Sequence, residues 1–226
     1  MFEERLFSAS FLDASLNELL ASEASDLHAY TPASGLPALR EALCDGLKPL
    51  SLPVSSDKIY VTCGASAGRA ILVRALLNEG DEVLFLYPPE DAFRSAVEAA
   101  GAVVVANGIL TKRTRLVVLS DHDPVPSGLV DFLHNAEKLY GQPVYLLADR
   151  LNDSEENLAL LRSYDSIILN EEFGDGFSGE CIGFLAVGDQ ARDAELLYAA
   201  FAGAARACGY VNPPSLMQRA ILKTVS

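Results

Sequence analysis

The stretch IYVTCGASAGRAILVRALL, residues 59–77, decides the fold of this chain. It begins with a short run of apolar and β-branched residues, turns at Gly64 and continues with an apolar helical pattern. We predict a strand over 58–62 and a helix over 65–77, joined by a tight turn. Strands that lead directly into helices are typical of α/β proteins, in which ligands bind at the carboxyl ends of the strands.

The same alternation of strands and helices continues along the chain. Further helices are predicted over 36–49, 90–100, 129–140, 155–162 and 191–207, with a shorter one within 11–27. Further strands are predicted over 82–86, 102–105, 116–119, 144–147, 166–169 and 182–187. Short, continuously apolar strands separated by helices favour a parallel sheet that is covered on both faces. We therefore predict a three-layer α/β/α domain with a mainly parallel sheet.

The composition argues against several classes of partner. The 226 residues include 17 basic and 31 acidic side chains, a net charge of −14, which disfavours binding to nucleic acid. No apolar run reaches the roughly 18 residues that a membrane-spanning helix needs. The first residues lack a signal-peptide pattern, and the four cysteines have no disulfide or metal spacing. We expect a cytoplasmic protein with no metal, membrane or nucleic-acid partner.

Nine segments resemble, in the same order, the class I/II aminotransferases, which are fold-type-I enzymes dependent on pyridoxal phosphate. The segments are YTPASGLPALR at 30–40, IYVTCGASA at 59–67, GDEVL at 80–84, PP at 88–89, TRLVVL at 114–119, PSG at 126–128, LAD at 147–149, GECIGF at 179–184 and YVNPPSLMQ at 210–218. Each segment is short, and their shared order carries the resemblance. It implies an N-terminal arm over 1–28 and an aminotransferase-like large domain over 29–226, without the family's C-terminal small domain.

The resemblance also implies a lysine that holds the cofactor aldehyde as a Schiff base. That lysine is expected after the strand at 166–169, where the best alignment places Glu171. A shifted alignment supplies no lysine, because none occurs between Lys138 and Lys223. Cys181 stands where an arginine contacts the cofactor phosphate. We therefore predict no catalytic residue in this chain.

Several cofactor contacts of the family persist. Gly64, Ala65 and Ser66 match its phosphate turn, where the amide groups at a helix N-terminus attract an anion. Asp149 matches the carboxylate that keeps the pyridine nitrogen protonated, and Tyr30 matches a tyrosine that reaches the partner subunit's phosphate site. These five residues are the predicted cofactor-binding set. Their alternative roles are a tight turn at Gly64, a helix cap at Asp149 and dimer packing at Tyr30.

The segment over 170–179 is predicted to be an acidic loop. Glu171, Glu172 and Asp175 are compatible with a new acid/base or metal cluster, or with a solvated loop. Of these, we favour the solvated loop.

The sequence thus predicts an aminotransferase-like protein that lacks transaminase activity and serves as a structural or regulatory partner. Pyridoxal phosphate is expected to bind weakly and without a covalent bond, or not at all. We expect a homodimer, or a heterodimer with an aminotransferase-like subunit. Two alternatives remain: a pyridoxal-phosphate-dependent transaminase or related enzyme completed by another subunit, and a gene fragment.

Overall fold

The computed structural model describes residues 9–225 except 23–25, 107, 121–123, 174–179 and 211. In this part of the chain seven strands form one sheet, in the order β1-β7-β6-β5-β4-β2-β3. β1 (Ile59–Thr62) and β6 (Ile167–Phe173) both pair antiparallel with β7 (Ile182–Val187). From β6 the sheet continues in parallel through β5 (Tyr145–Asp149), β4 (Thr114–Ser120), β2 (Glu82–Phe85) and β3 (Val103–Val105). The prediction of a mainly parallel sheet is confirmed.

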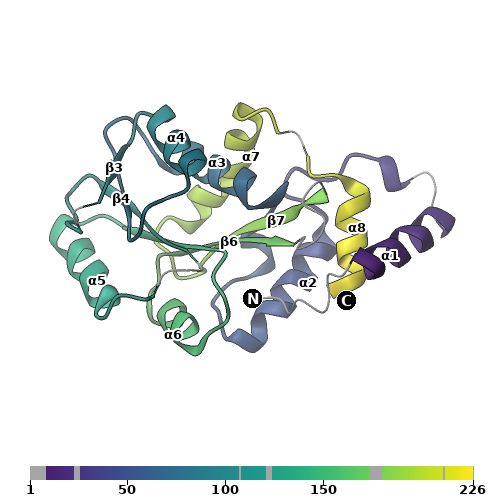
Figure 1. Ribbon diagram of the computed structural model, residues 1–226, viewed down its shortest axis with the longest axis horizontal. Helices are drawn as coiled ribbons and strands as arrows, with labels where there is room; N and C mark the ends of the chain where they lie inside the picture. Colours follow the sequence, from purple (N-terminus) through teal and green to yellow (C-terminus); the bar gives the residue numbers. More distant parts are fainter. Residues whose placement is uncertain are drawn as a thin grey trace.

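Helices cover both faces of the sheet, because successive strand residues point to opposite faces. One face packs against α3 (Gly64–Leu76), α4 (Asp91–Ala99) and α7 (Ala194–Ala207). The other packs against α2 (Pro37–Leu47), α5 (Leu129–Tyr140) and α6 (Glu155–Ser163). In β1, for example, Tyr60 belongs to the first apolar layer and Val61 to the second. The predicted three layers are visible in Figure 1.

Shorter elements complete the fold. Three 3₁₀ turns are described: η2 (Asp26–His28), η3 (Lys48–Leu50) and η4 (Ser56–Lys58). α1 (Ala9–Ser22) lies beside α8 (Ser215–Val225) at one end of the molecule (Figure 1), and Glu18 pairs with Lys223 between them. The domain boundary at residue 28 stays a prediction.

Two segments differ from the prediction. β6 continues to Phe173, so the predicted acidic loop at 170–179 is wrong for its first four residues. The reason is tertiary: β7 pairs with β6 as far as the Phe173–Ile182 pair, which holds the acidic residues in an extended strand. No helix was predicted near the end of the chain, where α8 forms and buries Met217 and Ile221.

Gln218 joins two of the segments that carry the resemblance. Its buried side-chain amide donates hydrogen bonds to the Thr31 hydroxyl at 3.0 Å and the Pro213 carbonyl at 2.9 Å. Its oxygen accepts a hydrogen bond from the Leu36 backbone amide at 2.8 Å. The hydrogen bonds of Gln218 therefore hold the 30–40 and 210–218 segments together. This gives both segments a structural role that is independent of catalysis.

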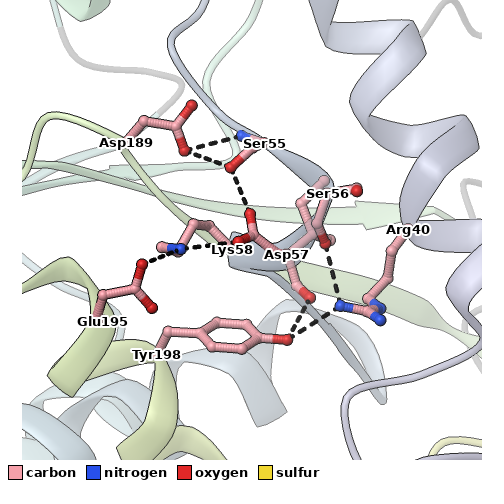
Figure 2. A network of polar contacts seen from close by, with 9 residues as sticks. Arg40, Ser55, Ser56, Asp57, Lys58, Asp189, Glu195 and Tyr198 are labelled. Atoms are coloured by element: carbon pink, nitrogen blue, oxygen red, sulfur yellow. Dashed lines mark hydrogen bonds and ion pairs between the residues drawn. The ribbon is translucent and has the colours of Figure 1, made fainter.

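A second polar network joins α2, η4 and α7 (Figure 2). Arg40 donates to the Ser56 carbonyl at 3.1 Å and to the Tyr198 hydroxyl at 3.2 Å. The buried Lys58 ammonium pairs with Asp57 at 3.1 Å and Glu195 at 2.6 Å. The hydrogen bond that Lys58 donates to Glu195 is the largest cause that raises the pKa of Lys58, against the effect of burial. The network holds α7 to the edge of the sheet beside β1.

Candidate functional site

The carboxyl ends of β1, β5 and β6 meet at one edge of the sheet. β1 and β6 run in the same direction, because each pairs antiparallel with β7, and β5 is parallel to β6. The register places Thr62 opposite Gly183 and Gly183 opposite Glu172. It also places Asp149 opposite Asn170. The predicted turn after β1 and the predicted carboxylate at the end of β5 therefore lie on one edge, where α/β proteins bind ligands.

Asp149 is bound by an arginine of its own chain. The Asp149 side chain is 1% exposed and the Arg69 side chain is 9% exposed. Nε of Arg69 donates to Oδ2 at 2.9 Å and to Oδ1 at 3.2 Å, and its Nη2 lies 2.8 Å from Oδ2. This is the forked pairing that makes arginine a strong partner for a carboxylate. The alternative role of Asp149 as a helix cap is wrong, because its carboxylate points to Arg69 instead.

Arg69 reaches α4 as well as β5. Its Nη1 pairs with Glu90 at 2.6 Å, just before α4, and its guanidinium lies 5.3 Å from the centre of the Phe93 ring. Burial disfavours the charged guanidinium, but the attraction and hydrogen bonds of Asp149, with those of Glu90, raise the pKa of Arg69. The hydrogen bond from Arg69 in turn lowers the pKa of Glu90. Arg69 therefore stays charged and links three elements.

Asn170 connects the two predicted parts of the site. Its side-chain amide donates to Oδ1 of Asp149 at 2.7 Å and to the Ala65 carbonyl at 3.2 Å. Gly68 makes room for it, since a Cβ at that position would lie 2.1 Å from Oδ1 of Asn170. Asn170, the first residue of the predicted 170–179 loop, thus joins Ala65 to Asp149.

A carboxylate lies on the turn at the start of α3. The backbone amide of Ala65 donates to Oε2 of Glu172 at 2.6 Å. Gly64 has a φ of +81°, which favours glycine, and a Cβ there would lie 2.9 Å from the same Glu172 oxygen. The Cys181 thiol lies 3.7 Å from the other oxygen of Glu172. The helix N-terminus therefore already faces a negative group.

Gly183 explains why β7 can approach this turn. A Cβ on Gly183 would lie 2.9 Å from the Gly64 carbonyl carbon and 2.5 Å from the Glu171 carbonyl oxygen. Only a residue without a side chain fits between β6 and the start of α3. The glycine in the GECIGF segment is thus explained by packing.

Glu171 lies inside the sheet, and the prediction of a solvated loop was wrong for it. It is 6% exposed and belongs to β6. Because strand side chains alternate, Glu171 points to the face of Leu169 and Phe173, opposite Asn170 and Glu172. Asp175 lies outside the described residues. Among the described residues no group of three or more His, Cys, Asp or Glu side chains is arranged to hold a metal ion.

Tyr30 and Ser66 are exposed, unlike the other predicted residues, which are buried. Tyr30 is 88% exposed and lines a shallow pocket between η2 and the start of α8. Ser66 is exposed on the first turn of α3. The role predicted for Tyr30 concerns a second subunit, so its position in one chain does not test that role.

Three residues of the site, Arg69, Asn170 and Glu90, were not predicted from the sequence. One signal was present: Arg69 is a lone charge in the otherwise small and apolar run ASAGRAILV. A charged residue in a helix that is buried against a sheet needs a partner. The identity of that partner depends on the fold, because Asp149 is 80 residues further along the chain.

The structure has the α/β/α sheet, the glycine turn and the buried aspartate at the strand ends that the resemblance to the class I/II aminotransferases implies. Comparisons with known proteins agree with this resemblance. The family model "Aminotransferase class I and II" matches residues 7–108. A probable aspartate aminotransferase of Methanocaldococcus jannaschii is 29% identical, over 71% of this chain and 49% of that protein. The methionine aminotransferase of Escherichia coli is 28% identical, over 60% of this chain and 41% of that protein.

Solved structures give the same result. A crystal structure of an amino transferase from Eubacterium rectale superimposes with a TM-score of 0.85 and 29% identity, over 96% of this chain and 63% of that one. Thermus thermophilus aspartate aminotransferase superimposes with a TM-score of 0.76 at 20% identity, which shows the fold alone. The resemblance to the class I and II aminotransferases is confirmed, and this chain has their fold. It spans about half the length of the curated relatives that it matches.

Proposed function

We propose that this chain is a pseudoenzyme with the aminotransferase fold, which does not transaminate and serves as a structural or regulatory subunit. The observation that carries the proposal is the absence of lysine over residues 139–222, which include β5, β6 and β7. In the alignment that the resemblance suggests, Glu171 occupies the place of the Schiff-base lysine. A carboxylate cannot form an imine with an aldehyde, so this position offers no covalent attachment.

The residues at the strand ends also do not fit pyridoxal phosphate. When bound, that cofactor supplies an electron sink for carbanion chemistry and carries a negative phosphate and a protonated ring nitrogen. Here Glu172 accepts the Ala65 amide at the turn proposed for the phosphate. Arg69 binds the carboxylate proposed for the ring nitrogen. We therefore propose that the cofactor binds weakly and without a covalent bond, or not at all.

The proposed role of this chain requires a surface that binds another subunit. Tyr30, in the loop after η2, is 88% exposed, and Leu196 on α7 is 72% exposed, so both of these large side chains face outward. Aminotransferases are usually dimers, and symmetric pairing is the commonest way to cover such surface. We propose a homodimer, or a heterodimer with an aminotransferase-like subunit, in which Tyr30 approaches the partner's phosphate turn.

We also propose that the protein is located in the cytoplasm. The four cysteines are free thiols in the structure, which agrees with a reducing compartment such as the cytoplasm. No helix in the described part of the chain is long and apolar enough to cross a membrane.

Borohydride trapping tests the proposal. The purified protein is incubated with pyridoxal phosphate, reduced with borohydride and digested for peptide mapping. We expect substoichiometric labels on exposed lysines such as Lys48 and Lys112, and no turnover of amino-acid substrates. Stoichiometric labelling of one lysine together with transaminase turnover would contradict the proposal, and would favour a working enzyme of the family.

A further inference from the structure

Two charged side chains of this chain match the two charged ends of pyridoxal phosphate in sign and place. Arg69 brings a positive group to Asp149, as a protonated pyridine nitrogen does in the family. Glu172 brings a negative group to the Ala65 amide, as the cofactor phosphate does. We propose that Arg69 and Glu172 are internal substitutes for the cofactor, which keep the strand ends folded without it and exclude it. This inference rests on the proposed function for the location of the cofactor site.

The substitute at Asp149 engages both oxygens of the carboxylate. Each carboxylate oxygen has about two acceptor positions. Oδ1 accepts from Arg69 Nε at 3.2 Å and from Asn170 at 2.7 Å. Oδ2 accepts from Arg69 Nε at 2.9 Å and lies 2.8 Å from Nη2. An incoming ring nitrogen would have to displace the guanidinium, and would offer one N–H group in its place.

The surroundings fix the arginine in this position. Glu90 holds Nη1 at 2.6 Å, and the Phe93 ring lies beside the guanidinium at 5.3 Å. These contacts come from the start of α4, whereas Asp149 ends β5 and Arg69 itself is on α3. Displacing Arg69 would therefore break contacts among three elements and leave Asp149 buried without a cation.

At the turn, the substitute is Glu172, which binds the start of α3 directly. The Glu172 oxygen lies 2.6 Å from the Ala65 amide nitrogen, a short, charge-assisted hydrogen bond. The helix N-terminus stabilises whichever negative group lies on it. A phosphate at the same amide would meet the Glu172 carboxylate within contact distance, so the two anions exclude each other.

Binding of a non-covalent probe tests the inference. Pyridoxine 5′-phosphate has the same ring and phosphate but an alcohol in place of the aldehyde, so it cannot label lysines. Its affinity is measured by equilibrium dialysis for the wild-type protein, Glu172→Gln, and the double variant Arg69→Met/Glu172→Gln. Matched controls are Arg74→Met, an exposed arginine on the same helix, and Glu98→Gln, an exposed glutamate on α4.

We expect no saturable binding to the wild-type protein or the controls below millimolar probe, and no rise of their Tm with probe. Glu172→Gln should bind at least tenfold more tightly than wild type, and the double variant more tightly still. If the double variant does not fold, Glu172→Gln alone decides the result. Micromolar binding to the wild-type protein, or folded variants that bind no better than wild type, would overturn the inference. Neither result alters the proposed lack of transamination, which is tested separately by borohydride labelling and turnover.

Discussion

Replacing Gly68 by alanine tests the contact between α3 and β6 with one methyl group. Gly68 lies inside α3 and has no positive φ, so backbone geometry alone permits an alanine. In an exposed helix interior the same change stabilises a protein by about 1 kcal/mol. Here the new Cβ would lie 2.1 Å from Oδ1 and 3.2 Å from Cγ of Asn170. The neighbour must therefore move.

The cost of that movement follows from the contacts of Asn170, which is fully buried. Moving its amide breaks the hydrogen bond to the Ala65 carbonyl, a loss of about 1 kcal/mol. It also breaks the bond to the Asp149 carboxylate, a loss of about 1.5–3 kcal/mol. Against the gain in helix propensity of about 1 kcal/mol, the net loss is about 1.5–3 kcal/mol.

Urea denaturation followed by circular dichroism measures this loss. Gly203→Ala is the matched control, because Gly203 lies inside α7 and a Cβ there would meet nothing within 4 Å. The control should gain up to about 1 kcal/mol. If Gly68→Ala is as stable as wild type while Gly203→Ala gains stability, then Asn170 is not held as described, and the joint between Ala65 and Asp149 is wrong.

Three further predictions concern the charges and the surface. Arg69 lowers the pKa of Glu90 below its ordinary 4.5, so their ion pair stabilises the fold above about pH 4.5 and is lost as the pH falls further. Glu90→Gln should lower the free energy of unfolding by less than about 1 kcal/mol at pH 7, and the difference in urea midpoint from wild type should vanish in acid. Tyr30→Asp should reduce the mass seen by light scattering at micromolar concentration from dimer toward monomer, and an unchanged mass would remove the role proposed for Tyr30. Glu171→Lys alone should not restore transamination, because residues that act as a unit do not recover singly; measurable turnover would show that little else is missing.

The layers of the fold were predictable because they depend on apolar periodicity. The strand at 182–187 and the helix at 129–140 have the predicted bounds, since each is delimited by turn residues and has a clear apolar pattern. The strand at 167–173 was predicted too short, because its last residues are charged and charged residues are usually exposed. The extra length comes from β7, a partner that the local pattern of β6 does not reveal.

The positions of the turn and of Asp149 could be predicted from the sequence, but the contacts of the charged side chains could not. Gly64 stands between the predicted strand and the predicted helix, so its turn could be placed from the sequence alone, whereas β5 runs two residues past the predicted strand and ends at Asp149. The contacts of Glu172 and Arg69 could not be placed. They join residues 107 and 80 positions apart, and their partners depend on how far each strand extends past its neighbour.

The charges at the strand ends bear on the proposed lack of transamination. Asp149 and Glu90 pair with the guanidinium of Arg69, and Glu172 accepts a hydrogen bond from the Ala65 amide at the turn. A phosphate placed about 4 Å from Glu172 would be opposed by about 4 kcal/mol for each pair of unit charges, at the effective dielectric constant of a protein surface. A lysine at position 171 would not relieve this repulsion directly, because residue 171 points to the opposite face of the sheet from Glu172. If the proposed exclusion of the cofactor holds, tight cofactor binding requires changes at the turn and at Arg69 before a lysine can be of use.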